Sequence, residues 1–198
     1  MTGATITESY TRTHDGYRIE STSKAVGLLA LLKPETIRIT SAGKLTAHGL
    51  QPATFIHERT LDTKRNARAD FDWSTHHITL TDRAGKRTLP LAAATQDRLS
   101  AMYQFMFTEL KNATTLSFKL TNGNKVDGYS YRITTGQSVT IPLGTFKATY
   151  LITPPQAGEN QTEIWLAADH ANLPYKMVIT EQDGGKLTQV LTRINIEP

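Results

Sequence analysis

The chain has 198 residues, which fits a single domain, and its apolar fraction of 38% supplies enough hydrophobic residues for a packed core and excludes bulk disorder. The net charge of +4 is small, and the absence of cysteine excludes disulfides, thiolate metal ligands and a cysteine nucleophile. No run reaches the roughly 18 apolar residues of a membrane-spanning helix, so the chain is not predicted to span a membrane.

Most of the chain alternates apolar and polar residues with a period of two, which is typical of strands with one buried face. Turn residues separate the alternating segments, and we interpret Asp15-Gly16, Ala42-Gly43 and Asn122-Gly123 as hairpin turns. The predicted strands are, in chain order, residues 5–12, 17–23, 36–41, 44–48, 53–61, 67–73, 77–81, 86–91, 115–121, 125–134, 139–143, 145–152, 161–167, 175–181 and 187–196.

Residues 25–32, Ala-Val-Gly-Leu-Leu-Ala-Leu-Leu, interrupt this alternation because they are wholly apolar. The run is too short to cross a bilayer and too apolar for a free surface loop. Two interpretations stay open. The run is a buried plug that closes one end of the sheet, or it is an apolar lip at a ligand cavity or a membrane-touching tip.

Residues 95–111 form the only segment with a helical period. Apolar side chains recur every three or four positions, which predicts one amphipathic helix. They are Leu99, Met102, Tyr103, Met106 and Leu110. Thr95 is the expected N-cap, and Asp97 lies in the first turn, where a carboxylate favours the positive end of the helix.

Together these elements predict an all-β, mainly antiparallel fold. We expect a curled sheet, barrel or half-barrel of about 12–15 short strands with the helix of residues 95–111 packed on it. No linker or repeat divides the chain, so a single domain over residues 1–198 is expected.

Several motifs occur in a fixed order along nearly the whole chain. They are Gly27-Leu-Leu-Ala-Leu-Leu-Lys-Pro34, Phe71-Asp-Trp73, Thr88-Leu-Pro-Leu91, Thr95-Gln-Asp-Arg-Leu-Ser100, Tyr129-Ser-Tyr-Arg-Ile133, Pro142-Leu-Gly-Thr145, Thr162-Glu-Ile-Trp-Leu-Ala167 and Leu173-Pro-Tyr-Lys-Met177. With these motifs the chain resembles the bacterial domain-of-unknown-function family 3108 (DUF3108). The resemblance implies an exported, periplasmic protein with a β-rich, barrel-like fold and no assigned activity. The chain opens without a signal segment, which we interpret as removed.

Candidate catalytic and metal-binding residues are few, and each has a simpler structural interpretation. Adjacent histidines in a strand point to opposite faces, so His76 and His77 do not chelate one ion, and no metal or cofactor is expected. Asp97, Arg98 and Ser100 resemble a nucleophile constellation, but a capping role for Asp97 is the stronger interpretation.

Charged side chains on the predicted strands have equally simple interpretations. Asp70 and Asp72 share a strand face, which favours a solvated surface over an acid–base pair. Basic residues gather around one predicted hairpin tip, where a solvated turn is favoured over a nucleic-acid patch. They are Arg59, Lys64, Arg65 and Arg68.

Large apolar and aromatic side chains exceed what a simple core needs. The leading hypothesis is therefore a non-enzymatic protein that binds an apolar ligand or lipid inside the curled sheet. The candidate lining residues are Leu28, Leu29, Leu31, Leu32, Phe71, Trp73, Tyr103, Met106 and Trp165. The alternative is an envelope scaffold or interaction module with a solid core, which holds a protein partner through a sheet edge or through residues 25–32. A hydrolase is the third interpretation, and it requires a cleft that joins Asp97, Arg98 and a histidine.

Overall fold

A computed structural model describes residues 3–27, 30–31, 34–155 and 158–196. The chain forms two compact units. Unit 1 consists of Met1–Gln104 and Phe118–Gly128, and unit 2 consists of Phe105–Ser117 and Tyr129–Pro198. The expectation that residues 1–198 behave as one domain stays a prediction.

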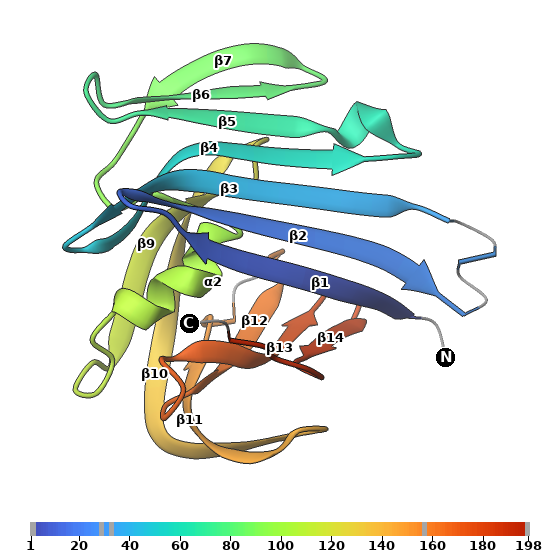
Figure 1. Ribbon diagram of the computed structural model, residues 1–198, viewed down its shortest axis with the longest axis vertical. Helices are drawn as coiled ribbons and strands as arrows, with labels where there is room; N and C mark the ends of the chain where they lie inside the picture. The colour runs from blue at the N-terminus through green and yellow to red at the C-terminus, as the bar shows by residue number, and fades with distance from the viewer. Residues whose placement is uncertain (1–2, 28–29, 32–33, 156–157, 197–198) are drawn as a thin grey trace. The chain divides into compact units, whose positions relative to one another are not determined.

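Unit 1 contains an antiparallel meander of seven strands, in which each strand pairs with the next along the chain (Figure 1). The strands are β1 (Gly3–Arg12), β2 (Gly16–Val26), β3 (Thr36–Thr46), β4 (Gly49–Arg59), β5 (Ala67–Asp72), β6 (His77–Asp82) and β7 (Gly85–Pro90). A short 3-10 helix, η1 (Thr63–Arg65), lies between β4 and β5. A two-residue strand, β8 (Gln96–Asp97), pairs in parallel with the end of β9 (Thr115–Thr121).

Unit 2 is built on a second antiparallel meander, with the strand order β14-β13-β12-β11-β10. Its strands are β10 (Val126–Ile141), whose first residues belong to unit 1, β11 (Gly144–Ile152), β12 (Gln161–Ala167), β13 (Leu173–Thr180) and β14 (Lys186–Val190). One of its cores combines Val139, Ile141, Ala148, Ala167 and Tyr175. The predicted strands 125–134 and 139–143 are one strand, β10, with an irregularity between Thr134 and Gln137.

The interpretation of Ala42-Gly43 as a hairpin turn is wrong. Strand β3 runs through both residues, and its register with β4 shifts at Ala42/Gly43 as a bulge. A Cβ at Gly43 would lie 2.1 Å from the carbonyl oxygen of Gln51, so glycine here permits a close approach of two strands. The chain reverses instead just before Gly49, whose φ is +99°.

The helix is shorter than residues 95–111. The α-helix α2 covers Ser100–Gln104, and a 3-10 turn, η2 (Phe105–Phe107), follows it. Gln96 and Asp97 pair with β9, which keeps the segment before Ser100 extended. Asp97, rather than Thr95, caps the helix, because its Oδ1 accepts the backbone N–H groups of Leu99 (2.9 Å) and Ser100 (2.8 Å).

The core of unit 1 covers one face of the sheet, which we call the inner face. Cross-strand pairing aligns Ile19, Ser41, Phe55, Ala69 and Leu80 in one row, and all five side chains are buried. Leu91, Leu99 and Tyr103 pack against this face, so α2 and the segment before it cover part of the sheet (Figure 1).

The inner face continues beyond this core row toward the ends of β4 and β6. The next row joins Glu8, Ser21, Ile39, His57 and Ala67, and polar side chains now alternate with apolar ones. A third row joins Ile6, Ser23, Ile37 and Arg59. Because side chains alternate along each strand, the inner face extends beyond the packed core and is partly polar there.

The predicted fold class is confirmed: the protein is mainly antiparallel β, and α2 is a short helix. Of the apolar run 25–32, Ala25 and Val26 end β2 and Leu31 is 81% exposed. Residues 28, 29 and 32 lie outside the described residues, so neither interpretation of the run is decided.

Candidate functional site: a basic pocket in unit 1

A pocket of about 560 Å³ lies in unit 1, and we call it the basic pocket. Its lining is dominated by cationic and amide side chains. The lining residues are His57, Arg59, Lys64, Arg65, Asp82, Arg83, Ala84, Arg98, Asn122 and Asn124. All of them belong to unit 1.

Short segments that are far apart in sequence bring these side chains together. His57 and Arg59 stand on the inner face of β4, beyond the core row. Lys64 and Arg65 come from η1, which connects β4 to β5, and Arg83 comes from the turn between β6 and β7. Arg98 follows β8, and its backbone N–H donates to the carbonyl oxygen of Thr121 (2.9 Å).

The turn at residues 122–125 contributes the amide side chains of the pocket. Oδ1 of Asn122 accepts the backbone N–H groups of Asn124 (2.9 Å) and Lys125 (3.2 Å), which folds the turn on itself. Gly123 has a φ of +88°, and a Cβ there would lie 2.8 Å from the Cβ of Ala67. The predicted turn at Asn122-Gly123 is confirmed, and only glycine lets it approach β5 so closely.

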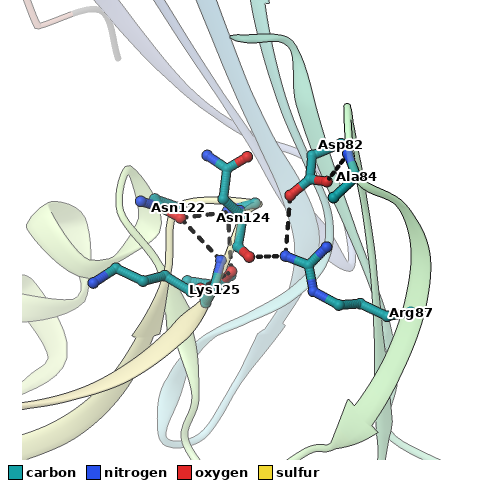
Figure 2. A network of polar contacts seen from close by, with 8 residues as sticks. Asp82, Ala84, Arg87, Asn122, Asn124 and Lys125 are labelled. Carbon is teal, nitrogen blue, oxygen red and sulfur yellow. Dashed lines mark hydrogen bonds and ion pairs between the residues drawn. The ribbon is translucent and has the colours of Figure 1, made fainter. Parts of the chain in front are cut away.

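Arg87 connects this turn to the edge of the sheet. Figure 2 shows its guanidinium group between the carboxylate of Asp82, at 3.0 Å, and the backbone carbonyl of Asn124. The other carboxylate oxygen of Asp82 accepts the backbone N–H of Ala84 (2.8 Å). These bonds lower the pKa of Asp82, the Arg87 bond most of all, and they keep the carboxylate ionised and neutralised by Arg87.

Arg59 is held rigidly where it enters the pocket. Its Nε donates to Oε1 of Glu35 (3.0 Å), and its Nη2 donates to Oε2 of the same carboxylate. Only 14% of the arginine side chain and 8% of the glutamate side chain are exposed. A two-point ion pair of this kind fixes the guanidinium plane as well as its position.

His57 supplies a neutral imidazole to this cationic surface. Its pKa is lowered to about 4, chiefly by burial and then by the nearby charges of Arg98 and Arg59, against the opposing influence of Glu35. The ring is therefore uncharged at neutral pH and offers one hydrogen-bond donor and one acceptor.

The residues predicted to line an apolar cavity are divided between the two units. Leu28, Leu29 and Leu32 lie outside the described residues. In unit 1, Phe71 is buried in the core and stacks on Trp73 at a ring distance of 6.0 Å.

Trp73 and Tyr103 also make polar contacts within unit 1. Nε1 of Trp73 donates to the carbonyl oxygen of Pro52 (2.6 Å). The ring of Tyr103 stacks on Tyr10 at 5.4 Å, and its hydroxyl donates to Glu8 (3.1 Å). Both side chains are anchored in place by these contacts.

The remaining predicted lining residues, Met106 and Trp165, belong to unit 2, where both are half-buried. Trp165 contacts the ring of Tyr150 at 4.9 Å, and the ammonium group of Lys176 lies 4.7 Å from the centre of the indole ring. The described members of the predicted set are therefore divided between the two units. The apolar cavity stays a prediction.

The possible nucleophile constellation has a structural role. Asp97 is fully buried, and besides capping α2 it accepts the hydroxyl of Ser41 at 2.6 Å. Ser100 is equally buried, and its hydroxyl bonds the backbone of Asp97. Arg98 and His57 do meet in the basic pocket, but Asp97 does not line it.

The basic cluster that the sequence analysis interpreted as a solvated turn overlaps the basic pocket. Of the clustered basic residues, Arg59, Lys64 and Arg65 line it, whereas Arg68 lies on the outer face and pairs with Asp70. The alternation of side chains along β4 could have indicated two of the lining residues, because it places His57 and Arg59 on one face of the strand. Spacing in the sequence contained no signal for Arg83 and Arg98, which only the folded meander brings to the same pocket.

Within the described ranges, no three His, Asp or Glu side chains are grouped as metal ligands. Among the same residues, no helix has the length and apolar character needed to cross a membrane.

The two meanders place the chain in the class of mainly antiparallel β folds. The structure is similar to the crystal structure of a beta-barrel-like protein of domain of unknown function DUF1849 from Brucella abortus, with a TM-score of 0.56 and 10% identity over 96% of this chain and 87% of that one. No curated protein matches the sequence. The family model described as protein of unknown function (DUF3108) matches residues 2–192, so the chain belongs to the DUF3108 family.

Proposed function

We propose that this protein is a non-enzymatic binding protein of the bacterial envelope and that its ligand occupies the basic pocket. The supporting observation is that the inner face of the unit 1 sheet continues past its packed core into a pocket of about 560 Å³. Sites for small molecules typically measure 300–1,000 Å³ and contain a few convergent polar groups. Export to the periplasm is part of the proposal and rests on the family resemblance.

The absence of catalytic activity is also part of the proposal. The carboxylate and hydroxyl that best resembled a nucleophile pair, Asp97 and Ser100, are used to cap α2. Asp82, the carboxylate that lines the basic pocket, is neutralised by Arg87. A neutral His57, with no serine, threonine or tyrosine hydroxyl among the residues that line the pocket, suits ligand recognition better than acid–base chemistry.

The test is organic extraction of the purified protein followed by mass spectrometry, together with native mass spectrometry of the intact protein. We expect a stoichiometric small molecule that is lost when Ala84→Trp fills the pocket. Thr81→Trp is the matched control, because Thr81 is exposed and pairs with Lys86 on the outer face of the same hairpin. A ligand-free wild type, or a ligand retained equally by both variants, contradicts this location.

An apolar ligand or lipid belongs to the same proposal. The third row of the inner face places Ile37 next to Arg59 and Ile6 two strands beyond Ile37, and Ile6 is 39% exposed. An acyl chain could lie along these isoleucines while its polar end enters the pocket. Extraction distinguishes this ligand from a water-soluble one by its mass and its partition into solvent.

A protein-interaction module is the second candidate. The exposure of Leu31, 81%, favours it, because a large apolar side chain in water is typical of a binding surface. Crosslinking in intact cells from a photoreactive residue at position 31 tests this candidate. A defined crosslinked partner, absent when the photoreactive residue is moved to Thr81, supports it.

A further inference from the structure

We infer that the ligand of the basic pocket carries a phosphate-class anion, held by the guanidinium and ammonium groups of Arg59, Lys64, Arg83 and Arg98. This inference rests on the proposed function, and it assigns a chemical class to the ligand of that same pocket.

The first support is the balance of charge around the pocket. Five cationic side chains line it, namely Arg59, Lys64, Arg65, Arg83 and Arg98, and Asp82 is the carboxylate among the lining residues. Asp82 is already paired with Arg87, which does not line the pocket. The pocket therefore presents an excess of positive charge, which in a concave site raises the local concentration of anions.

The second support is that two of the cations form no ion pair among the residues that the structure describes. Arg59 pairs with Glu35 and Arg65 pairs with Asp62. Lys64 and Arg83, in contrast, form no ion pair with any residue of the described chain. Both are exposed, so their charges are available to a ligand that enters the pocket.

The third support is the direction from which the donors come. The cations belong to four separate segments, namely the end of β4, η1, the β6–β7 turn and the residue after β8. A planar carboxylate is satisfied by one two-point contact with a single arginine. A phosphate has three or four oxygens in a tetrahedral arrangement and suits donors that converge from several sides.

Neutral donors complete the site. Oδ1 of Asn122 is occupied by the backbone N–H groups of its own turn, so the side-chain amino group is left to donate elsewhere. The uncharged imidazole of His57 also lines the pocket and adds one N–H donor. The turn and β4 thus offer N–H donors to an anion.

Phosphate could come from a soluble molecule or from a lipid headgroup, and the test separates these sources. Isothermal titration calorimetry of the full chain, after removal of bound ligand, uses glycerol 3-phosphate and short-chain dihexanoyl phosphatidic acid as probes. The test variant is Lys64→Gln/Arg83→Gln, which removes the two unpaired cations. The matched control is Lys24→Gln/Lys86→Gln, which removes the same charge from exposed positions outside the pocket.

We expect one or both probes to bind the wild type. For each probe that binds, the dissociation constants of the wild type and the control variant should agree within twofold. The test variant should bind at least tenfold more weakly, because it loses two charge-assisted contacts. Binding of phosphatidic acid alone identifies a headgroup, and equal binding of both probes identifies the phosphate itself.

Three results would overturn the inference. Suppose that neither probe binds but an uncharged molecule occupies the pocket and is expelled by Ala84→Trp. The inference of an anionic ligand is then wrong, and the proposed function stands. If the probes bind equally to test and control variants, general charge attraction explains the binding. If no probe binds and no ligand is extracted, the inference and the proposed function fail together.

Discussion

The hydroxyl of Ser41 on β3 donates a 2.6 Å hydrogen bond to Oδ2 of Asp97, 56 residues further along the chain, and both side chains are fully buried. The hydroxyl of Tyr17 lies 3.1 Å from the same serine oxygen. The other oxygen of Asp97 caps α2. The hydrogen bond between Ser41 and Asp97 connects β3 to the segment before α2. It also holds in place Arg98, the residue that follows Asp97 and lines the basic pocket.

Asp97→Ala should lower the free energy of unfolding by about 2–4 kcal/mol. It removes the helix cap, worth about 1 kcal/mol, and leaves buried donors without partners at a further cost of about 1–3 kcal/mol. Urea denaturation followed by circular dichroism measures the change. Ser41→Ala and the double variant complete a mutant cycle, and strictly additive losses would contradict the proposed coupling.

Gly123→Ala should destabilise the protein more than Gly85→Ala. Both glycines have a positive φ, +88° and +102°, so an alanine at either position costs about 1–2 kcal/mol of backbone strain. At Gly85 a Cβ meets no atom within 4 Å, whereas at Gly123 it overlaps Ala67 and approaches Phe55 at 3.3 Å. We expect an additional loss of about 1–3 kcal/mol at Gly123 from overpacking.

The same pair of variants tests whether the turn shapes the basic pocket. Gly123→Ala should weaken ligand binding because Asn122 and Asn124 shift with the turn, while Gly85→Ala should leave it unchanged. Equal stability of the two variants in urea would show that the turn relaxes away from β5 without cost.

The ion pair between Glu35 and Arg59 should be far more costly to break than an exposed pair. Glu35→Gln leaves the guanidinium group largely buried without its counter-ion, and we expect a loss of about 3–5 kcal/mol. Glu20→Gln is the matched control, because Glu20 and Arg18 form a pair at 2.7 Å with more than half of each side chain exposed. That pair should contribute less than about 1 kcal/mol. Similar losses in the two variants, measured in urea, would contradict the buried character of the Arg59 pair.

His57 should make the protein less stable as the pH falls from about 6.5 to about 4. An unfolded histidine takes up a proton near its ordinary pKa of about 6.5, whereas folded His57 has a pKa of about 4. Between these values the unfolded chain binds more protons, so acid favours unfolding.

The variant His57→Gln tests this expectation. Urea midpoints at pH 7.5 and pH 5 should differ less in His57→Gln than in the wild type. His77→Gln replaces an exposed histidine on β6 and should preserve the wild-type difference. An identical pH dependence in all three proteins would exclude His57 as its source.

How well a feature could be predicted depends on how far apart in the chain the residues that determine it lie. Strands and the turn at Asn122-Gly123 depend on neighbouring residues, so alternation and turn chemistry predicted them. The helix was predicted too long because residues 96 and 97 pair with β9, a contact with a distant strand. The pocket depends on the register of the whole meander, which brings Arg83 and Arg98 to His57, and no local pattern contains that register.

A single cooperative unfolding transition is the final prediction, and the two tryptophans allow it to be measured. Trp73 belongs to unit 1 and Trp165 to unit 2. The chain passes between the units three times, after Gln104, Ser117 and Gly128, so β9 and β10 contribute residues to both. Strands shared in this way should unfold together.

In Trp165→Phe the fluorescence reports unit 1, and in Trp73→Phe it reports unit 2. Within each variant, the urea transition by fluorescence should coincide with the transition by far-ultraviolet circular dichroism, which reports the strands of both units. The comparison is made within one variant because Trp73→Phe also loses the hydrogen bond to Pro52 and should lower stability by about 1 kcal/mol. Fluorescence midpoints that separate from the circular dichroism midpoints in both variants, in opposite directions, would establish two independently folding domains.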